Sequence, residues 1–240
     1  MNKDTSDMSK NAETVTETPN DKASALNNID VLSQYLKTNA GMREGRAIPP
    51  LEKWDPKNVT DMDLIIKANG EWWHEGAKVT RESLVSLFAS VLWKEDNNGT
   101  TEYYLKTPVQ KMRIHVEDAP LLINDVGIVS ENDVSWLEFT TTTGDVVRLD
   151  DEHSITLKTY DSKDNNAING VDNDTRLENI HNVETAVRPY MLVRNNLTAL
   201  ISRNTFYHLT EIGELSEDGK ETVLTLQSGG KSYQLSMPNS

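Results

Sequence analysis

The sequence contains no cysteine among its 240 residues. This absence excludes disulfides, thiol nucleophiles and thiolate metal sites together, and it agrees with a reducing compartment. Phosphate-binding loops, the GxGxxG pattern and the GxSxG nucleophile elbow are also missing. The sequence therefore carries no motif from which a reaction can be derived.

Long apolar runs are missing as well. No stretch approaches the roughly 18 apolar residues of a membrane span, and residues 1–24 lack the apolar core of a signal peptide. We therefore expect a cytoplasmic protein that does not associate with a membrane. Hydrophobic residues make up only 36% of the chain and charged residues 26%, which indicates that part of it stays outside any core.

The formal net charge is −14, which argues against nucleic-acid binding because a polyanion repels a phosphate backbone. Half of this charge lies in two polar segments, residues 1–30 and 159–187. Their low apolar content predicts a disordered tail over residues 1–24 and a disordered insertion over residues 159–187. The remaining body is only mildly acidic, so an anionic ligand is compatible with it.

Residues 25–59 are predicted to form an amphipathic helix followed by a proline-bounded linker. Leu26, Ile29, Leu32 and Leu36 recur at near-helical spacing. Such a helix docks either on the body of the protein or on a partner. The second possibility leaves open a role as a protein–protein adaptor.

Two β-rich modules are expected after the linker, over residues 60–155 and 156–240. In the first, Asn69-Gly70 predicts a hairpin, Thr80 is a candidate N-cap for a helix over residues 80–94, and Gly144 predicts a second hairpin. Gly229-Gly230 predicts a last hairpin in the second module. Strands with few helices indicate an α+β class.

An internal repeat supports the two modules. Shifting the chain by 87 residues places Leu105 on Leu192, Ile114 on Ile201, Leu122 on Leu209 and Leu137 on Leu224. Because repeats of this length mark duplicated supersecondary units, we expect two related modules that pack against each other.

The stretch QKMRIHVED has the alternation of a half-buried strand. Its apolar residues would face the core, while Lys111, Arg113 and His115 would face outward. These outward residues form either a solvated face or a cationic row suited to phosphate or carboxylate. Arg188 and Arg194 fall near the repeat equivalents of this row.

Three further groups are candidate sites. Trp73 and His74 lie at a strand end and could form the edge of a binding site. Glu117 and Asp118 are neighbours on a strand and point to opposite faces, so they are not expected to act as an acid–base pair; Asp118 is expected to cap a turn. The run from Asp150 to His153 suits a divalent ion, but it lacks further histidine at ligand spacing. We assign no metal, no cofactor and no catalytic residue.

Six motifs occur in an order that resembles an uncharacterised bacterial family, domain of unknown function 1285. They are PPLEKWDP, NGEWWHEG, LVSLFASVLWKE, YYLKTPVQKMRIHVEDAP, GDVVRLDDEH and RPYMLVRNNLTALISRNTFYHL. The resemblance covers residues 48–240 apart from the polar insertion. It implies a duplicated α+β architecture with a C-terminal half loosely like a pleckstrin-homology fold, a ligand site between the halves for a nucleotide-like molecule, and a signalling role.

Together these observations predict a non-enzymatic regulatory protein that binds an anionic or nucleotide-like small molecule between its modules. The ligand residues would be Trp73, His74, Lys111, Arg113, Arg188 and Arg194. One alternative is a hydrolase that uses His74 or His153 with nearby carboxylates. A homo-oligomer or a protein partner also stays open.

Overall fold

The computed structural model describes residues 28–39, 48–160, 186–219 and 221–238. The expected disordered tail lies outside these residues, as does most of the insertion. The two ends of the predicted insertion are strand instead, since Thr159 and Tyr160 end one strand and Ala186 begins the next. No helix of the described residues is long and apolar enough to cross a membrane.

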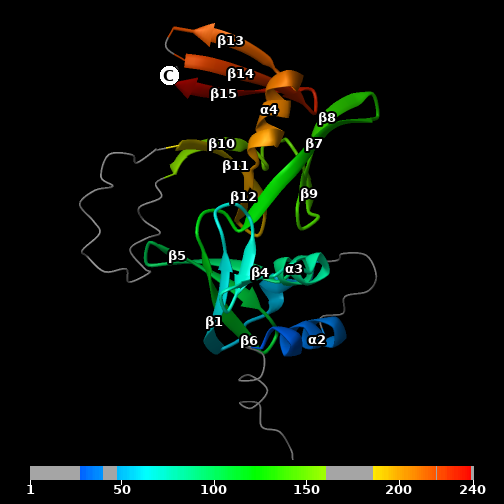
Figure 1. The fold of residues 1–240 in the computed structure, drawn as a ribbon. Coiled ribbons are helices and arrows are strands. Elements are labelled where there is room, and N and C mark those ends of the chain that lie inside the picture. Colours follow the sequence, from blue (N-terminus) through cyan, green and yellow to red (C-terminus); the bar gives the residue numbers. More distant parts are fainter. Residues whose placement is uncertain (1–27, 40–47, 161–185, 220, 239–240) are drawn as a thin grey trace, which may run out of the picture.

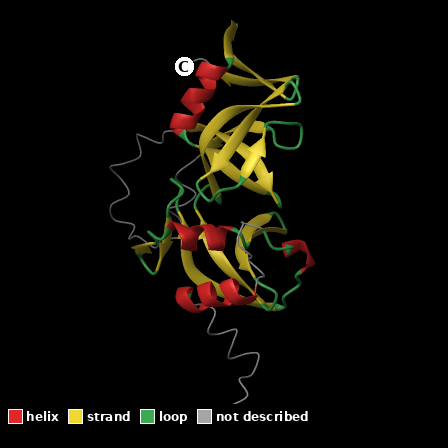
Figure 2. Cartoon of the chain, turned by 90° about the vertical axis from the view of Figure 1, so that its right-hand side faces the viewer, coloured by secondary structure: helices red, strands yellow, loops and turns green. Residues whose placement is uncertain are grey.

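Three α-helices, one short 3-10 helix and fifteen strands make up the described chain (Figure 1). The strands form the body of the molecule, with the helices against them (Figure 2). In chain order the elements are α2 (Ile29–Asn39), η1 (Leu51–Lys53), β1 (Asn58–Ile66), β2 (Trp72–His74), β3 (Ala77–Lys78), α3 (Glu82–Ala89), β4 (Leu92–Asn97), β5 (Thr100–Lys106), β6 (Gln110–Val116), β7 (Leu121–Glu131), β8 (Val134–Thr141), β9 (Val146–Arg148), β10 (Ile155–Tyr160), β11 (Ala186–Arg194), β12 (Leu197–Ile201), α4 (Arg203–Ile212), β13 (Glu214–Asp218), β14 (Glu221–Ser228) and β15 (Lys231–Pro238).

Two six-stranded sheets share one topology. The N sheet has the order β3-β2-β1-β6-β5-β4 and the C sheet has the order β9-β8-β7-β12-β11-β10. Each consists of two antiparallel three-stranded meanders, and the first strand of the first meander pairs in parallel with the last strand of the second. The predicted duplication is therefore present as two copies of the same strand order.

The boundary between the sheets differs from the expected one. The N sheet ends at Val116 and the C sheet begins at Leu121, so the predicted boundary at 155/156 falls inside the C sheet. The cause is the parallel pairing of β7 with β12, in which Leu121 lies opposite Ala199 and Ile123 opposite Ile201. Such a long-range pairing leaves no local signal in the sequence.

The residue alignment of the predicted repeat is only partly right. The shift of 87 matches β5 and β6 with β11 and β12, which are equivalent in topology. It then places Leu122 of β7 on Leu209 of α4, and Leu137 of β8 on Leu224 of β14. The topological counterparts of β7–β9 are β1–β3. The second half of the alignment therefore matched similar apolar patterns in elements that are not equivalent in the fold.

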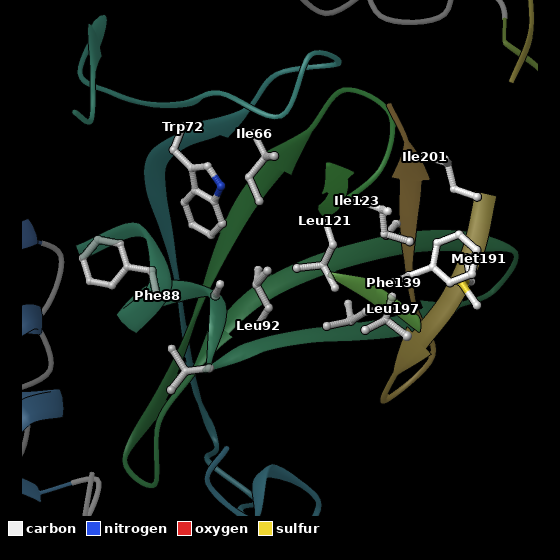
Figure 3. Packing of buried hydrophobic residues seen from close by; sticks show 14 of the residues in the cluster. Ile66, Trp72, Phe88, Leu92, Leu121, Ile123, Phe139, Met191, Leu197 and Ile201 are labelled. Carbon is white, nitrogen blue, oxygen red and sulfur yellow. The ribbon is translucent and has the colours of Figure 1, made fainter. Parts of the chain in front are cut away.

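A continuous hydrophobic core runs through both modules (Figure 3). The N module contains the N sheet with α2 and α3, and the C module contains the C sheet with α4 and β13–β15. Phe88 of the N module and Phe139 of the C module are the largest fully buried side chains. The turn between β1 and β2 joins the modules directly, because a Cβ placed on Gly70 would lie 2.7 Å from Cδ2 of Leu122. The modules are thus packed against each other, as the sequence predicted.

The two N-terminal helices differ in how well the sequence located them. Helix α2 forms where its apolar spacing predicted, and Leu32 and Leu36 are fully buried, so its apolar face packs on the body. Helix α3 begins after Arg81 instead of Thr80, and it ends at Ala89. Leu92 and Trp93 pair with β5 as part of a strand, because tertiary pairing overrides the local helical pattern.

A three-stranded terminal sheet, β13-β14-β15, follows α4 and packs on the C sheet. Ser228 joins the two sheets, since its Oγ accepts a bond from Leu137 N at 3.0 Å and donates to Leu149 O at 2.8 Å. Beside it, Trp136 lies over Gly229 so closely that a Cβ there would come within 2.4 Å of the indole. A glycine is therefore required at this turn.

We expect Gly229→Ala to destabilise the protein by roughly 2 kcal/mol more than Gly230→Ala. Both glycines have positive φ, +61° and +75°, so both substitutions incur backbone strain, but only Gly229 meets a neighbouring side chain. Urea unfolding of the two variants measures the difference. Equal losses of stability would show that Trp136 does not fix the terminal sheet.

Candidate functional site

A cleft of about 760 Å³ lies at the seam between the two modules. One side is α3 with Ile48, and the other is the β8–β9 turn with the end of β11. Small-molecule sites typically have volumes of roughly 300–1,000 Å³. The lining residues are Ile48, Glu82, Ser83, Ser86, Leu87, Ala89, Ser90, Thr142, Thr143, Gly144, Asp145, Val146, Val147, Val193 and Arg194.

Helix α3 and its C-cap present a serine face to the cleft, made of Ser83 and Ser86 in the helix and Ser90 at the cap. Their spacings of three and four residues place them along one side of the helix. The apolar side is buried, with Leu84 and Phe88 in the core. The helix is about 12 Å long at 1.5 Å per residue, so its hydroxyls can contact a molecule of that length.

The opposite wall is the tight turn between β8 and β9. Gly144 adopts a φ of +88°, and Asp145 N donates to Thr141 Oγ1 at 2.8 Å. The hydroxyls of Thr141 and Thr143 donate to Asp145 Oδ2 at 3.2 and 3.1 Å. This network holds the Asp145 carboxylate, whose side chain is 10% exposed, against β11.

Arg194 connects the two walls. Its Nε donates to Asp145 Oδ1 at 2.7 Å, and its Nη2 donates at 2.7 Å to the carbonyl oxygen of Ala89, the last residue of α3. Its Nη1 is buried and donates to no atom of the described residues. Among the six predicted ligand residues, Arg194 is the one that lines this cleft.

The predicted cationic row has the expected alternation but lies outside the cleft. Met112 and Ile114 are buried, while Lys111 and Arg113 point to the other face. Lys111 Nζ lies 2.5 Å from Glu95 Oε2. Arg113 pairs with Glu102 at 3.0 Å and with Asp61 at 3.2 Å. Both cations are thus paired with carboxylates of their own sheet. Arg113, 46% exposed, corresponds to the solvated-face interpretation, whereas the Lys111 side chain is only 17% exposed.

Trp73 and His74 lie on β2, near the edge of the N sheet. Trp73 Nε1 donates to Glu71 Oε2 at 3.1 Å. His74 Nδ1 lies 2.7 Å from the carbonyl oxygen of Asp63, which fixes the proton on Nδ1 in the neutral ring. These contacts hold both side chains to their own sheet and away from the cleft lining.

Arg188 belongs to a separate polar cluster at the start of the C module. Its Nη1 donates to Asp118 Oδ2 at 2.7 Å, and its guanidinium lies 3.6 Å from the centroid of the Tyr160 ring. Tyr190 Oη donates to Asp118 Oδ1 at 2.6 Å. Burial, together with the Asp118 carboxylate, raises the pKa of Tyr190. Asp118 therefore holds strand β11 through Arg188 and Tyr190. The prediction that Asp118 caps a turn was wrong.

Glu117 and Asp118 act separately, as predicted from their opposite directions. Glu117 Oε1 accepts a bond from Lys67 Nζ at 2.7 Å, and Oε2 accepts one from Ala68 N at 3.0 Å. Burial raises the pKa of Glu117, but the bonds from Lys67 and Ala68 outweigh it and hold the pKa below its ordinary value. Glu117 thus fixes the β1–β2 turn, which carries Gly70 to the C module.

The run from Asp150 to His153 forms a turn. Asp150 Oδ1 accepts bonds from the backbone N of Glu152 at 2.9 Å and of His153 at 2.7 Å, and it lies 3.0 Å from His153 Nδ1. In the parts of the chain that the structure describes, no three His, Cys, Asp or Glu side chains come together as metal ligands.

The serine face and the β8–β9 turn were missed in the sequence. A signal was present, because Ser83, Ser86 and Ser90 alternate with the apolar side of the predicted helix. The turn residues Thr142–Asp145 were recognised only as a hairpin connection. Their position opposite α3 depends on the packing of the two modules, which the sequence does not encode locally.

We expect Arg188→Met to reduce stability by about 3 kcal/mol, because it leaves the Asp118 carboxylate, 7% exposed, without its cation. Arg113→Met should cost less, since an exposed ion pair contributes roughly 0–1 kcal/mol and the Arg113 side chain is 46% exposed. Adding Asp118→Asn to Arg188→Met should recover part of the loss. Urea unfolding tests all three, and no recovery in the double variant would contradict the assigned pairing.

Glu117→Gln should destabilise the protein by about 1 kcal/mol at pH 7. Because the pKa of Glu117 is lowered by folding, its stabilisation is complete above the unfolded pKa of about 4.3 and is lost as the pH falls through the folded value. The native and variant stabilities should therefore converge under acid conditions. Glu152→Gln, at an exposed position, serves as the control and should show no such convergence.

Comparison with known proteins places the chain in a family. The model of the N-terminal domain of the domain of unknown function DUF1285 matches residues 49–119. The model of the C-terminal domain of the DUF1285 proteins of unknown function matches residues 164–235. No functionally curated protein matches the sequence significantly. Residues 120–163, which lie between the two matches, contain β7–β10 of the C sheet.

Two solved structures are similar to this chain. A DUF1285 family protein from Silicibacter pomeroyi is 30% identical, with 84% of this chain and 94% of that chain covered and a TM-score of 0.61. A DUF1285 family protein from Shewanella baltica is 24% identical, with 62% and 91% covered and a TM-score of 0.39. The two matched domain models cover more than half of the sequence, and the chain accordingly belongs to the DUF1285 family.

Proposed function

We propose that this protein binds a small anionic molecule in the cleft between its modules and acts as a non-enzymatic regulatory protein. One observation supports this proposal: both modules line the cleft, one through α3 and the other through the β8–β9 turn and β11. A molecule bound there contacts both modules, so its presence would alter the seam that joins them.

The chemistry of the lining favours a polar ligand. The hydroxyls of Ser83 and Ser86 can donate and accept hydrogen bonds along the α3 wall. Those of Ser90 and Thr143 already donate to Leu87 O and Asp145 Oδ2, so they offer a ligand acceptors. Apolar contact comes from Leu87, Val147 and Val193. Arg194 supplies the positive charge, and a guanidinium is suited to carboxylate and phosphate groups. A nucleotide-like or sugar-phosphate molecule combines these features.

The alternatives have weaker support in the geometry. Each of the two histidines considered for hydrolysis is bonded through Nδ1 within its own strand or turn, His74 to Asp63 O and His153 to Asp150. The apolar face of α2, which an adaptor would offer to a partner, is buried on the body at Leu32 and Leu36. A cytoplasmic location and the pleckstrin-homology likeness remain part of the proposal.

A thermal-shift screen with nucleotides, sugar phosphates and dicarboxylates tests ligand binding. A compound present at 100 times its Kd should stabilise the protein by about 2.7 kcal/mol. Ser86→Phe, which fills the cleft from α3, should abolish this effect. Ser130→Phe, at an exposed position on β7, should retain it. The proposal fails when no compound stabilises the native protein, or when Ser86→Phe responds like the native chain.

A further inference from the structure

We propose that the ligand's oxyanion binds Arg194 by displacing Asp145, so that occupation of the cleft releases the β8–β9 turn. This inference rests on the proposed function and adds to it the group that the ligand must carry and the part of the protein that responds. The exchange involves the guanidinium of Arg194 and the Asp145 carboxylate that now accepts a bond from its Nε.

Asp145 holds Arg194 through one bond only. Its Oδ1 accepts from Arg194 Nε, while Oδ2 is used by the hydroxyls of Thr141 and Thr143. Arginine binds carboxylate and phosphate most strongly through two parallel N–H bonds. The internal pair is therefore a weaker arrangement than a ligand with two free oxygens could form.

The other nitrogens of Arg194 offer such a ligand a place. Nη2 donates to Ala89 O at the end of α3, and each guanidinium Nη carries a second N–H. Nη1 is buried and donates to no atom in the described parts of the chain. A buried donor without an acceptor is unfavourable, so the guanidinium is incompletely bonded. An oxyanion that replaces Asp145 can bond Nε and the second N–H of Nη2 together, one bond more than Asp145 makes.

An oxyanion reaches Nε only when the turn that carries Asp145 moves. Residues Thr142–Asp145 line the cleft beside Arg194, and Asp145 occupies its Nε. Gly144 in this turn has a φ of +88°, in a region that glycine adopts without strain. Release of the turn would not leave Asp145 without partners, because its Oδ2 keeps the two threonine hydroxyls.

The position of the anion also sets the orientation of the ligand. Arg194 bonds the C-terminal end of α3 at Ala89, whereas Glu82 lies at the opposite end of the helix and also lines the cleft. The serine face extends between them. The ligand would therefore place its phosphate or carboxylate at Arg194 and direct hydroxyl or amino groups along α3 toward Glu82.

Asp145→Asn tests the displacement, because it removes the competing charge while keeping an acceptor oxygen for the threonines. We expect the dissociation constant for inorganic phosphate, followed through the Arg194 Nε–H resonance by NMR, to fall about tenfold relative to the native protein, which corresponds to about 1.4 kcal/mol. Asp151→Asn is the matched control, since Asp151 is an exposed carboxylate paired with Lys231 at 2.5 Å. It should bind phosphate as the native chain does.

Arg194→Lys should abolish the response to phosphate of the backbone amide resonances of Thr142–Asp145, because a lysine lacks the two-pronged donor geometry. In the native protein, saturating phosphate should speed hydrogen exchange of the Thr142 amide, which joins the turn to β7 through a bond of 2.8 Å to Leu122 O. This second measurement does not depend on how the variants fold. Unchanged or weaker phosphate binding by Asp145→Asn, or unchanged exchange at Thr142, would overturn the displacement.

The two proposals fail in different ways. A screening compound whose effect is lost in Ser86→Phe but is unaltered in Asp145→Asn and Arg194→Lys would establish cleft binding without exchange at Arg194. Phosphate shifts confined to other arginines would indicate an adventitious ion only, and would count against the role of Arg194. The absence of any phosphate binding by Asp145→Asn would do the same.

Discussion

The whole architecture depends on one contact made twice, the parallel pairing of the first and last strands of each sheet. In the N sheet this is β1 with β6, and in the C sheet it is β7 with β12. Without these pairings each sheet would be two separate three-stranded meanders. The β1–β6 pairing also places the C-terminal ends of these two strands together, beside the linker over residues 117–120 that leads into β7.

Charged residues near the seam are of two kinds: some are fully hydrogen-bonded within the protein, and others keep a donor that a ligand could bind. Asp118 and Glu117 are fully engaged, with Arg188 and Tyr190 on one side and Lys67 and Ala68 on the other. Arg194 is different, because one of its nitrogens makes no bond to the described protein atoms and its carboxylate partner sits on a turn. A strongly paired cluster fixes position, whereas a partly paired one can exchange partners.

The sequence predicted local structure well and long-range structure poorly. The Asn69-Gly70 and Gly229-Gly230 hairpins, helix α2 and the alternation in β6 all follow from turn chemistry or periodicity. The boundary at 155/156 was misplaced because the β7–β12 pairing joins residues about 80 positions apart. Charge alone could not separate Arg194 from Lys111 and Arg113, because their difference lies in which carboxylate each one meets after folding. The serine face of α3 had a visible period, yet its meaning depends on the wall opposite it.

The parallel pairings also bear on the order in which the chain acquires structure during synthesis. The N sheet can close once residue 116 has left the ribosome, whereas β7 must wait for β12, which ends at Ile201. After β9 and before β12 have been synthesised, the β7 edge of the β7–β9 meander has no pairing strand. Such an unpaired edge can pair with strands of other chains. Asn124 and Asp125 are exposed on this strand, and polar residues on a waiting edge reduce that hazard. The first strand of the C sheet thus waits longer for its parallel partner than the first strand of the N sheet does, because more residues separate β7 from β12 than separate β1 from β6.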